Sequence, residues 1–266
     1  MFTSIGICGT GNMGKAIIQG LVGSGLIGPE HIYIYNIHKA KAEAIQRELG
    51  VSVVDSAAAL VKRAEAVILA VKPNSMESVL AEINDVVQAD TVVISIAAGL
   101  TIDRLAAPLP QGTKIIRVMP NTPALVGEGM SALAVNDAVT EDEKAAALAV
   151  FESFGKAALV AEQLIDAVCG LSGSGPAYVY MFIEAMADGA VLEGMPRQMA
   201  YTFAAQTVLG AAKMVLETGE HPGKLKDDVC SPGGTTIEAV RVLEEKGFRA
   251  AAAAAVVAST EKNKAL

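Results

Sequence analysis

The chain has 266 residues, which is enough for one large domain or two modest ones with a substantial core. Hydrophobic residues make up 52% of it and aromatic residues only 4%, so aliphatic side chains must fill that core. The formal net charge of −8 argues against nucleic acid as a partner, because phosphate binding needs clustered Lys and Arg.

The cysteines and the apolar runs indicate the kind of compartment. Cys8, Cys169 and Cys230 are odd in number and far apart, a pattern typical of free thiols in a reducing cytosol. The first residues contain no basic segment of the kind that opens a targeting signal, and the apolar run at 250–258 is too short to span a bilayer. No cluster of Cys and His suggests a metal. We therefore expect a cytoplasmic protein with no membrane partner and no metal.

In the first part of the chain, up to about residue 160, short β-rich runs alternate with helical segments. The predicted strands are 4–8, 32–35, 51–54, 66–71, 91–96, 114–119, 131–135 and 156–160. The helical segments between them include 13–24, 39–49, 56–64 and 75–87. Strands that are apolar throughout and alternate with helices predict an α/β domain over residues 1–160, with a mostly parallel sheet and helices on both faces.

After residue 160 the strand pattern ends, and residues 175–194, 197–219 and 235 onward predict helices. The first of these helices is apolar on nearly every side, and Glu184 and Asp188 are its main polar interruption. Such a helix must be buried all round, either beneath the first domain or, as we favour, under a second subunit. We therefore expect an all-α dimerisation domain over residues 161–266.

A G-x-G-x-x-G motif, formed by Gly9, Gly11 and Gly14, follows the first predicted strand and opens a helix. This context indicates a dinucleotide-binding turn of the Rossmann type, in which Gly9 makes the tight turn and Gly14 packs closely. Gly11 would let the backbone approach a pyrophosphate, beside Asn12 and Met13. The alternative is an ordinary tight turn between a strand and a helix.

The second predicted strand ends at Asn36, where an NAD site usually carries Asp or Glu for the ribose 2′-hydroxyl. The absence of this carboxylate, with His38, Lys39 and Lys41 nearby, suits the 2′-phosphate of NADP. The alternative is that Lys39 and Lys41 are only the solvated first turn of a helix. NADPH is therefore the expected cofactor, with NADH as the other candidate.

Three further turns begin where predicted strands end, which is the crevice where open α/β sheets bind ligands. Taken alone, Pro73 and Pro120 in these turns are more typical of turn formers. The residues of these turns that we expect at the cofactor are Ala70, Val71, Lys72, Pro73, Ala97, Ala98, Gly99 and Asn121.

The stretch VCSPGGTTIEAV, residues 229–240, is a glycine-rich loop that runs into a helix. Thr235 and Glu238 fit a capping box, so we expect the helix to begin at this point. The adjacent Gly233 and Gly234 allow a backbone to approach a ligand closely, with N–H groups directed outward. Alternatively, the two glycines are only a loose lead-in to a capped helix.

Six stretches of the chain, taken in order, resemble the Δ1-pyrroline-5-carboxylate reductase family. They are GTGNMG, AVKP, AAG, MPNTPALVGEG, LSGSGPAY and VCSPGGTTIEAV, and the resemblance covers residues 4 to about 250. It implies an NAD(P)H-dependent oxidoreductase that reduces 1-pyrroline-5-carboxylate to L-proline, the last step of proline biosynthesis. It also implies a Rossmann domain followed by a helical domain that intertwines with its twin in a homodimer, and it allows larger oligomers of dimers.

The resemblance also implies functional residues in the loop. The substrate's carboxylate is expected at Ser231, Gly233, Gly234, Thr235 and Thr236, with the backbone N–H groups of Gly233, Gly234 and Thr235 as its donors. Thr235 is expected in the helix cap, which leaves the hydroxyl of Thr236 as the catalytic group near the imine nitrogen.

The chain departs from the family at two places. The family commonly has Asn-Arg-Ser or Asn-Arg-Thr after the second strand, whereas Ile37 follows Asn36 here and cannot hold a phosphate. After the third strand, the segment with Asp55 and Ser56 replaces a family Asn near the adenine.

Two other functions fit parts of the sequence. A β-hydroxyacid dehydrogenase shares the Rossmann start but places a catalytic Lys on the helix after that domain, and residues 171–190 contain no Lys. A non-catalytic NADP-sensing scaffold protein is the other alternative, and the intact SPGGTT loop is the feature that argues against it.

Overall fold

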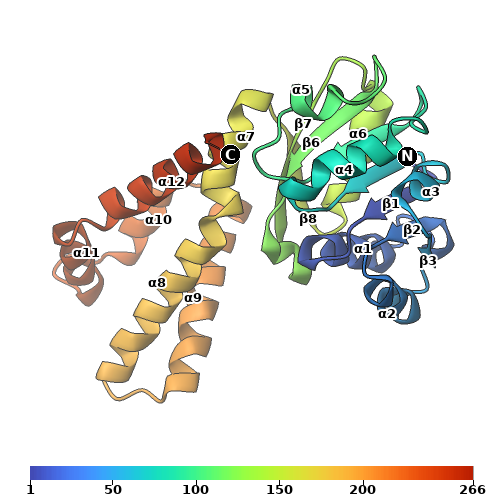
Figure 1. The fold of residues 1–266 in the computed structure, drawn as a ribbon. Helices are drawn as coiled ribbons and strands as arrows, with labels where there is room; N and C mark the ends of the chain where they lie inside the picture. The colour runs from blue at the N-terminus through green and yellow to red at the C-terminus, as the bar shows by residue number, and fades with distance from the viewer. Residues whose placement is uncertain (266) are drawn as a thin grey trace. The chain divides into compact units, whose positions relative to one another are not determined.

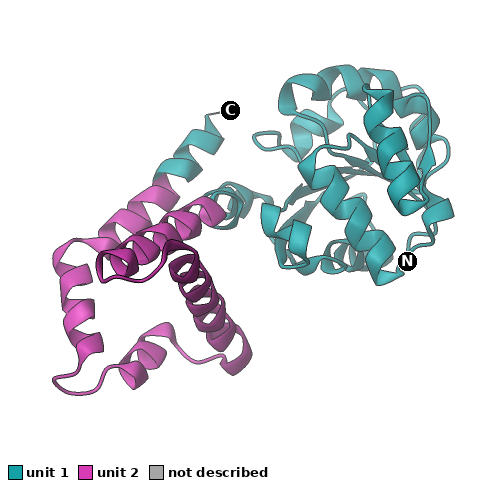
Figure 2. Ribbon diagram, turned by 90° about the horizontal axis from the view of Figure 1, so that it is seen from below, with its two compact units in different colours: residues 1–174, 258–266 teal, residues 175–257 magenta. Residues whose placement is uncertain are grey.

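The computed structural model describes residues 1–265, which form two compact units (Figure 2). Unit 1 consists of residues 1–174 together with the last segment of the chain from Ala258, and unit 2 consists of residues 175–257. These two units are defined by the contacts between residues of one chain. The functional domains 1–160 and 161–266 stay a prediction.

Within residues 1–265, the strands form one sheet of eight in unit 1, with the order β3-β2-β1-β4-β5-β6-β7-β8 (Figure 1). They are β1 (Ile5–Cys8), β2 (Ile32–Tyr35), β3 (Ser52–Val53), β4 (Ala66–Leu69), β5 (Val92–Ser95), β6 (Lys114–Met119), β7 (Gly129–Val135) and β8 (Gly155–Leu159). Only the pair β6–β7 is antiparallel. A short 3₁₀ turn, Thr122–Val126, joins these two strands, whereas a parallel pair needs a longer crossover. The mostly parallel sheet is confirmed.

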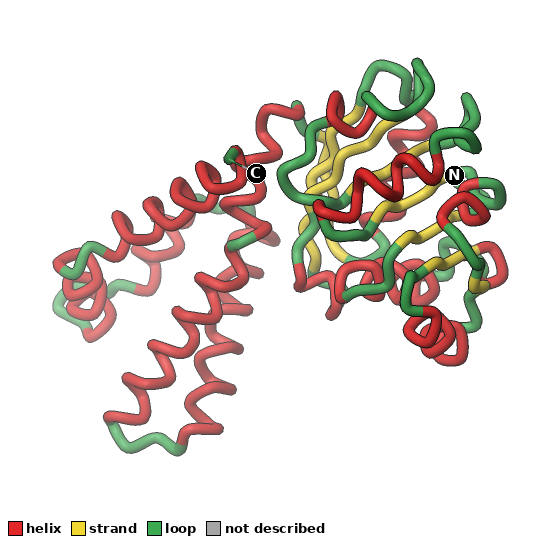
Figure 3. Tube along the Cα trace, in the orientation of Figure 1, coloured by secondary structure: helices red, strands yellow, loops and turns green. Residues whose placement is uncertain are grey.

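Helices cover both faces of this sheet, and the strands lie between them (Figure 3). The helices of unit 1 are α1 (Asn12–Ser24), α2 (Lys39–Leu49), α3 (Ala57–Val61), α4 (Pro73–Ile83), α5 (Ile102–Ala106), α6 (Glu141–Glu152) and α7 (Ile165–Val168). Alternate residues of β1 face two separate cores, because successive side chains of a strand point to opposite faces. Ile5 and Ile7 pack with α1, α2 and α6, whereas Cys8 packs with α3, α4 and α5.

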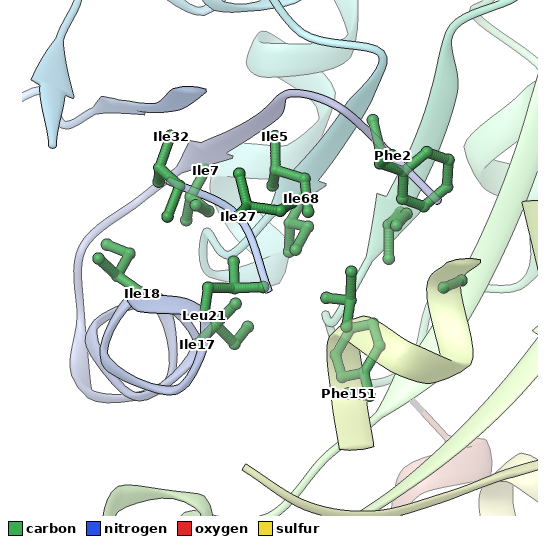
Figure 4. Close-up of a cluster of buried hydrophobic side chains, with 14 of the residues drawn as sticks. Phe2, Ile5, Ile7, Ile17, Ile18, Leu21, Ile27, Ile32, Ile68 and Phe151 are labelled. Atoms are coloured by element: carbon green, nitrogen blue, oxygen red, sulfur yellow. The ribbon is translucent and has the colours of Figure 1, made fainter. Parts of the chain in front are cut away.

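The core on the α1 face is built from aliphatic side chains (Figure 4). Ile17, Ile18 and Leu21 of α1 are fully buried beside the strand residues Ile7 and Ile32. These three helix positions share one side of α1, since residues three and four apart lie on one helix face. This packing fixes the start of α1 at the carboxyl end of β1.

Unit 2 is helical, as predicted. Its helices are α8 (Gly175–Leu192), α9 (Arg197–Thr218), α10 (Pro222–Val229), α11 (Thr235–Glu245) and α12 (Phe248–Lys264), the last of which continues into unit 1. Gly247, with a φ of 74°, separates α11 from α12. Helix α10 was not expected. Within residues 1–265, none of the helices is long and apolar enough to cross a membrane.

Helix α8 is not buried all round within one chain. Of its residues, all of which the structure describes, Ala187 alone is buried, in a small cluster with Ala200 and Ala204 of α9. Large apolar side chains such as Met181 and Leu192 are 69% and 86% exposed. Within its own unit, α8 thus leaves much of its apolar surface uncovered.

Candidate active site

The residues predicted at the cofactor lie in the turns that follow the carboxyl ends of the parallel strands, and we call this side of the sheet the sheet edge. The order of the strands reverses at the pair β1–β4, and open α/β sheets bind ligands at such a switch point. Backbone hydrogen bonds join the turns: the Gly9 N–H donates to Tyr35 and the Ala70 N–H to Cys8, each over 2.8 Å. The predicted residues at this edge are Gly9, Gly11, Asn12, Met13, Gly14, Asn36, His38, Lys39, Ser56, Ala70, Val71, Lys72, Pro73, Ala97, Ala98, Gly99 and Asn121.

Different structural constraints apply to the three glycines of the first turn. Gly9 has a φ of 101°, and a Cβ there would lie 2.5 Å from the carbonyl oxygen of Ala70. A Cβ on Gly14 would lie 2.1 Å from the carbonyl oxygen of Gly9. At Gly11, however, a Cβ would meet nothing within 4 Å among the described residues outside its own neighbours. Packing explains Gly9 and Gly14, whereas Gly11 faces open space.

The start of α1 can therefore accept an anion. Its N-cap is Gly11, in extended conformation, and no side-chain cap bond is made there within the described chain. Unsatisfied N–H groups and the helix dipole make such a terminus favourable for phosphate. With open space at Gly11, these residues fit a dinucleotide pyrophosphate.

The turn after β2 is braced by Asn36. Its Nδ2 donates to the hydroxyl of Thr10 over 2.6 Å, and its Oδ1 accepts from the N–H of His38 over 2.8 Å. Lys39 is the first residue of α2, and its Nζ lies 3.4 Å from a carboxylate oxygen of Asp55 in the turn after β3. Sequence reasoning missed the roles of Thr10 and Asp55 because both contacts join separate turns.

The remaining turns are also held internally. Ser56 caps α3, since its hydroxyl accepts from the N–H of Ala59 over 3.0 Å. The amide of Asn121 donates to the carbonyl of Ser172 and accepts from the N–H of Met130, at 3.0 and 2.9 Å. Asn121 thereby ties the end of β6 to β7 and to the segment that precedes α8.

The loop before α11 contains a tight turn. The Gly234 N–H donates to the carbonyl of Ser231 over 3.0 Å, and Gly233 has a φ of 68°. Proline at the second position and a left-handed residue at the third are the signature of a type II turn. A Cβ on Gly234 would lie 2.3 Å from the hydroxyl oxygen of Ser231. The positive φ therefore favours glycine at Gly233, whereas at Gly234 the Ser231 hydroxyl can rotate away and the nearest backbone atom, the carbonyl oxygen of Ser231, would lie 3.1 Å from the added Cβ.

The predicted capping box is wrong. The N-cap of α11 is Gly234, whose φ of −80° and ψ of 171° are extended, so Thr235 is already the first helical residue. Glu238 binds Arg241 instead, with Oε2 3.0 Å from Nε. Both Thr235 and Thr236 are thus outside the cap, and α11 begins as α1 does, with an extended glycine N-cap.

A cluster of charged side chains surrounds the buried Arg117 and was not predicted. Arg117 of β6 is 3% exposed and lies 3.1 Å from Glu162 and 3.4 Å from Asp166. Asn263, near the end of α12, donates to the same Asp166 oxygen over 2.7 Å. This cluster anchors the end of α12 and the start of α7 to β6.

The environments of Cys8 and Cys169 do not favour a nucleophile. Burial, with a smaller contribution from Glu82, raises the pKa of the Cys8 thiol to about 12. Burial also raises the pKa of Cys169, and Asp166 adds to the rise. Thiols with raised pKa values stay protonated near neutral pH and react poorly.

Comparisons with known proteins identify the family of the chain. Residues 162–266 match the family model described as pyrroline-5-carboxylate reductase dimerisation, and residues 4–99 match the model described as NADP oxidoreductase, coenzyme F420-dependent. The pyrroline-5-carboxylate reductase of Escherichia coli is 54% identical over 100% of this chain and 99% of its own length.

Solved structures show the same similarity over whole chains. A pyrroline-5-carboxylate reductase from Coxiella burnetii has a TM-score of 0.93 and 34% identity, and the match covers 98% of this chain and 97% of that one. Pyrroline carboxylate reductase of Plasmodium falciparum, solved with NADP bound, has a TM-score of 0.89 and 33% identity over 99% of this chain and 97% of that one. The chain belongs to the pyrroline-5-carboxylate reductase family.

Proposed function

We propose that this chain, an NAD(P)H-dependent oxidoreductase of its family, reduces 1-pyrroline-5-carboxylate to L-proline with NADPH as preferred cofactor. The observation that carries the proposal is the pair of uncapped helix starts at α1 and α11, each with an extended glycine N-cap. One start suits the cofactor's pyrophosphate and the other a small carboxylate. The relative solved with NADP supports the choice of cofactor.

The sheet edge would hold the cofactor, which supplies the hydride when bound. In this proposal, the start of α1 at Gly11 binds the pyrophosphate, and the turn with His38 and Lys39 binds the 2′-phosphate end. Asn121 keeps its turn in place through the bonds to Ser172 and Met130. Holding the reacting groups in a fixed orientation, away from water, is the main task of such a site.

The turn before α11 would hold the substrate's carboxylate. Ser231, Gly233 and Gly234 shape the turn, and the Gly234 N–H is already used within it. The N–H groups of Thr235 and Thr236 at the helix start are then the donors for the carboxylate. The Thr236 hydroxyl would orient the imine nitrogen. A protonated imine is already an electrophile, so this chemistry does not demand a strong acid from the chain.

The function is tested by following NADPH absorbance with purified protein and 1-pyrroline-5-carboxylate. If the protein oxidises neither NADPH nor NADH in this assay, the proposed function is contradicted. The substrate loop is tested by Thr235→Pro, which removes one backbone N–H while proline remains well suited to a first helical position. The extended backbone of Gly234 is compatible with a following proline.

Thr235→Ala is the matched control, since it removes the side chain and keeps the N–H. A charge-assisted bond is worth about 1.5–3 kcal/mol, so Thr235→Pro should raise the substrate KM about 10- to 100-fold. Thr235→Ala should change it little, and the NADPH affinity should be unaffected in both. Equal KM values for the two variants would show that this N–H does not bind the carboxylate.

We also propose that the chain works as a homodimer in the cytoplasm. The apolar surface of α8 and α9, including Met181 and Phe203 at 69% and 61% exposure, supports a partner of the same kind. Three free cysteines suit a reducing compartment.

A further inference from the structure

The turns after β2 and β3 lie side by side. The two strands are paired in parallel, with Ile34 opposite Val53, and the Val54 N–H continues the pairing to the carbonyl of Ile34 over 3.0 Å. Lys39 and Asp55 follow in these neighbouring turns, and their charged atoms lie 3.4 Å apart. Their side chains are 68% and 90% exposed, so both charges are open to solvent and to a ligand.

Asn36 and Ile37 of this turn are unsuited to recognise the ribose. Asn36 cannot turn toward it without losing its bonds to Thr10 and to the His38 N–H. Ile37 is 83% exposed and offers no polar atom beyond its backbone. The Lys39–Asp55 pair, next to His38, therefore presents exposed charges to a ribose or its 2′-phosphate.

We propose that Asp55 determines the cofactor preference of this chain by competing with the 2′-phosphate for Lys39. The inference rests on the cofactor site proposed above. A phosphate monoester carries nearly two negative charges, so it attracts Lys39 and repels Asp55. Exposed ion pairs are weak, so the phosphate can displace Asp55, but each binding event must do so. A cofactor without the 2′-phosphate leaves the ion pair intact. Asp55 thus reduces the difference between the affinities of the chain for NADPH and for NADH.

The test measures binding of adenosine 2′,5′-bisphosphate and of 5′-AMP, which differ only in the 2′-phosphate. Isothermal titration calorimetry of the two ligands needs no substrate and no hydride transfer. Asp55→Asn should tighten binding of the bisphosphate about 3- to 10-fold and change 5′-AMP less than about twofold. In a Lys39→Ala background, the same change at Asp55 should have a smaller effect, because the competition for Lys39 is gone and only the direct repulsion between Asp55 and the phosphate remains.

Asp85→Asn is the matched control. Asp85 is exposed and follows the carboxyl-terminal end of α4, whereas the cofactor turn lies at the amino-terminal end of that helix. Asp85→Asn removes the same charge as Asp55→Asn, so this variant should bind both ligands with the affinities of the unmodified chain. At 0.5 M salt, the gain from Asp55→Asn should shrink, since salt screens exposed charges. The proposal is overturned if Asp55→Asn leaves the ratio of the two affinities unchanged, or weakens bisphosphate binding. A chain that passes this test but does not reduce 1-pyrroline-5-carboxylate would contradict the proposed function alone.

Discussion

Alanine at Gly11 and alanine at Gly14 should have opposite consequences, although they are the same change three residues apart. A Cβ on Gly14 would lie 2.1 Å from the carbonyl oxygen of Gly9, where real contacts are at least 3.0 Å. Helix α1 must then shift by roughly 1 Å, and overpacking of this kind costs about 1–3 kcal/mol. For a unit of this size, that lowers the Tm by about 2–10 °C.

At Gly11 the added methyl group meets no atom of the described residues within 4 Å, so only the slightly poorer N-cap is expected, at under about 1 kcal/mol. The same methyl group would occupy the space in which the pyrophosphate lies in our proposal. Loss of one or two backbone bonds to phosphate should weaken NADPH binding about 10- to 100-fold.

Thermal unfolding without cofactor, followed by NADPH fluorescence titration, separates the two effects. The chain contains no Trp, so the nicotinamide fluorescence can be followed without indole emission. Gly14→Ala should lower the Tm, whereas Gly11→Ala should keep the Tm and lose affinity. If Gly11→Ala binds NADPH normally, the pyrophosphate is not at this turn; if it lowers the Tm as much as Gly14→Ala, the packing argument is wrong.

Three further predictions concern the reaction, the assembly and the stability. Thr236→Ala should lower kcat at least about tenfold and leave NADPH affinity unchanged, whereas Thr236→Ser should retain kcat, as steady-state kinetics would show. Light scattering should find a dimer, and Phe203→Asp on the exposed surface of α9 should shift it toward monomer; an active monomeric unmodified chain would contradict the proposed assembly. Because burial holds the pKa of Cys8 at about 12 instead of 9.0, the unfolded thiol ionises first, and stability should fall as the pH rises between these values. Urea unfolding should show a slope of about 1.4 kcal/mol per pH unit from this group, and Cys8→Ala should remove it.

The strands could be predicted because their apolar runs are continuous and bounded by turn residues. Their ends were less predictable: β4 stops at Leu69 instead of Val71, and β3 keeps only Ser52 and Val53. A strand ends where its pairing with a neighbouring strand ends. The sequence of one strand does not show how long its neighbour is, so the end of the pairing cannot be predicted from it.

Arg117 shows a limit of a different kind. It lies within the apolar strand β6, and its partners Glu162 and Asp166 follow 45 and 49 residues later. No local pattern joins residues so far apart, so the sequence showed a charge in a strand and gave no reason for it. Helix α10 was missed because it is short and has few apolar residues, while Pro222 and Gly223 at its start suggested a loop.

The two helix starts at α1 and α11 explain why glycine patterns alone could not identify the ligand sites. At α1, packing requires Gly9 and Gly14, and the one glycine that packing leaves unexplained, Gly11, faces the proposed ligand. At α11, Gly233 has a positive φ and Gly234 lies close to Ser231, so replacing either would disturb the turn as well as any ligand site. What the two starts share is the extended glycine N-cap, which leaves backbone N–H groups without a competing side chain. What the loop before α11 binds is therefore tested by removing a backbone N–H donor at the start of that helix, and not by replacing a glycine.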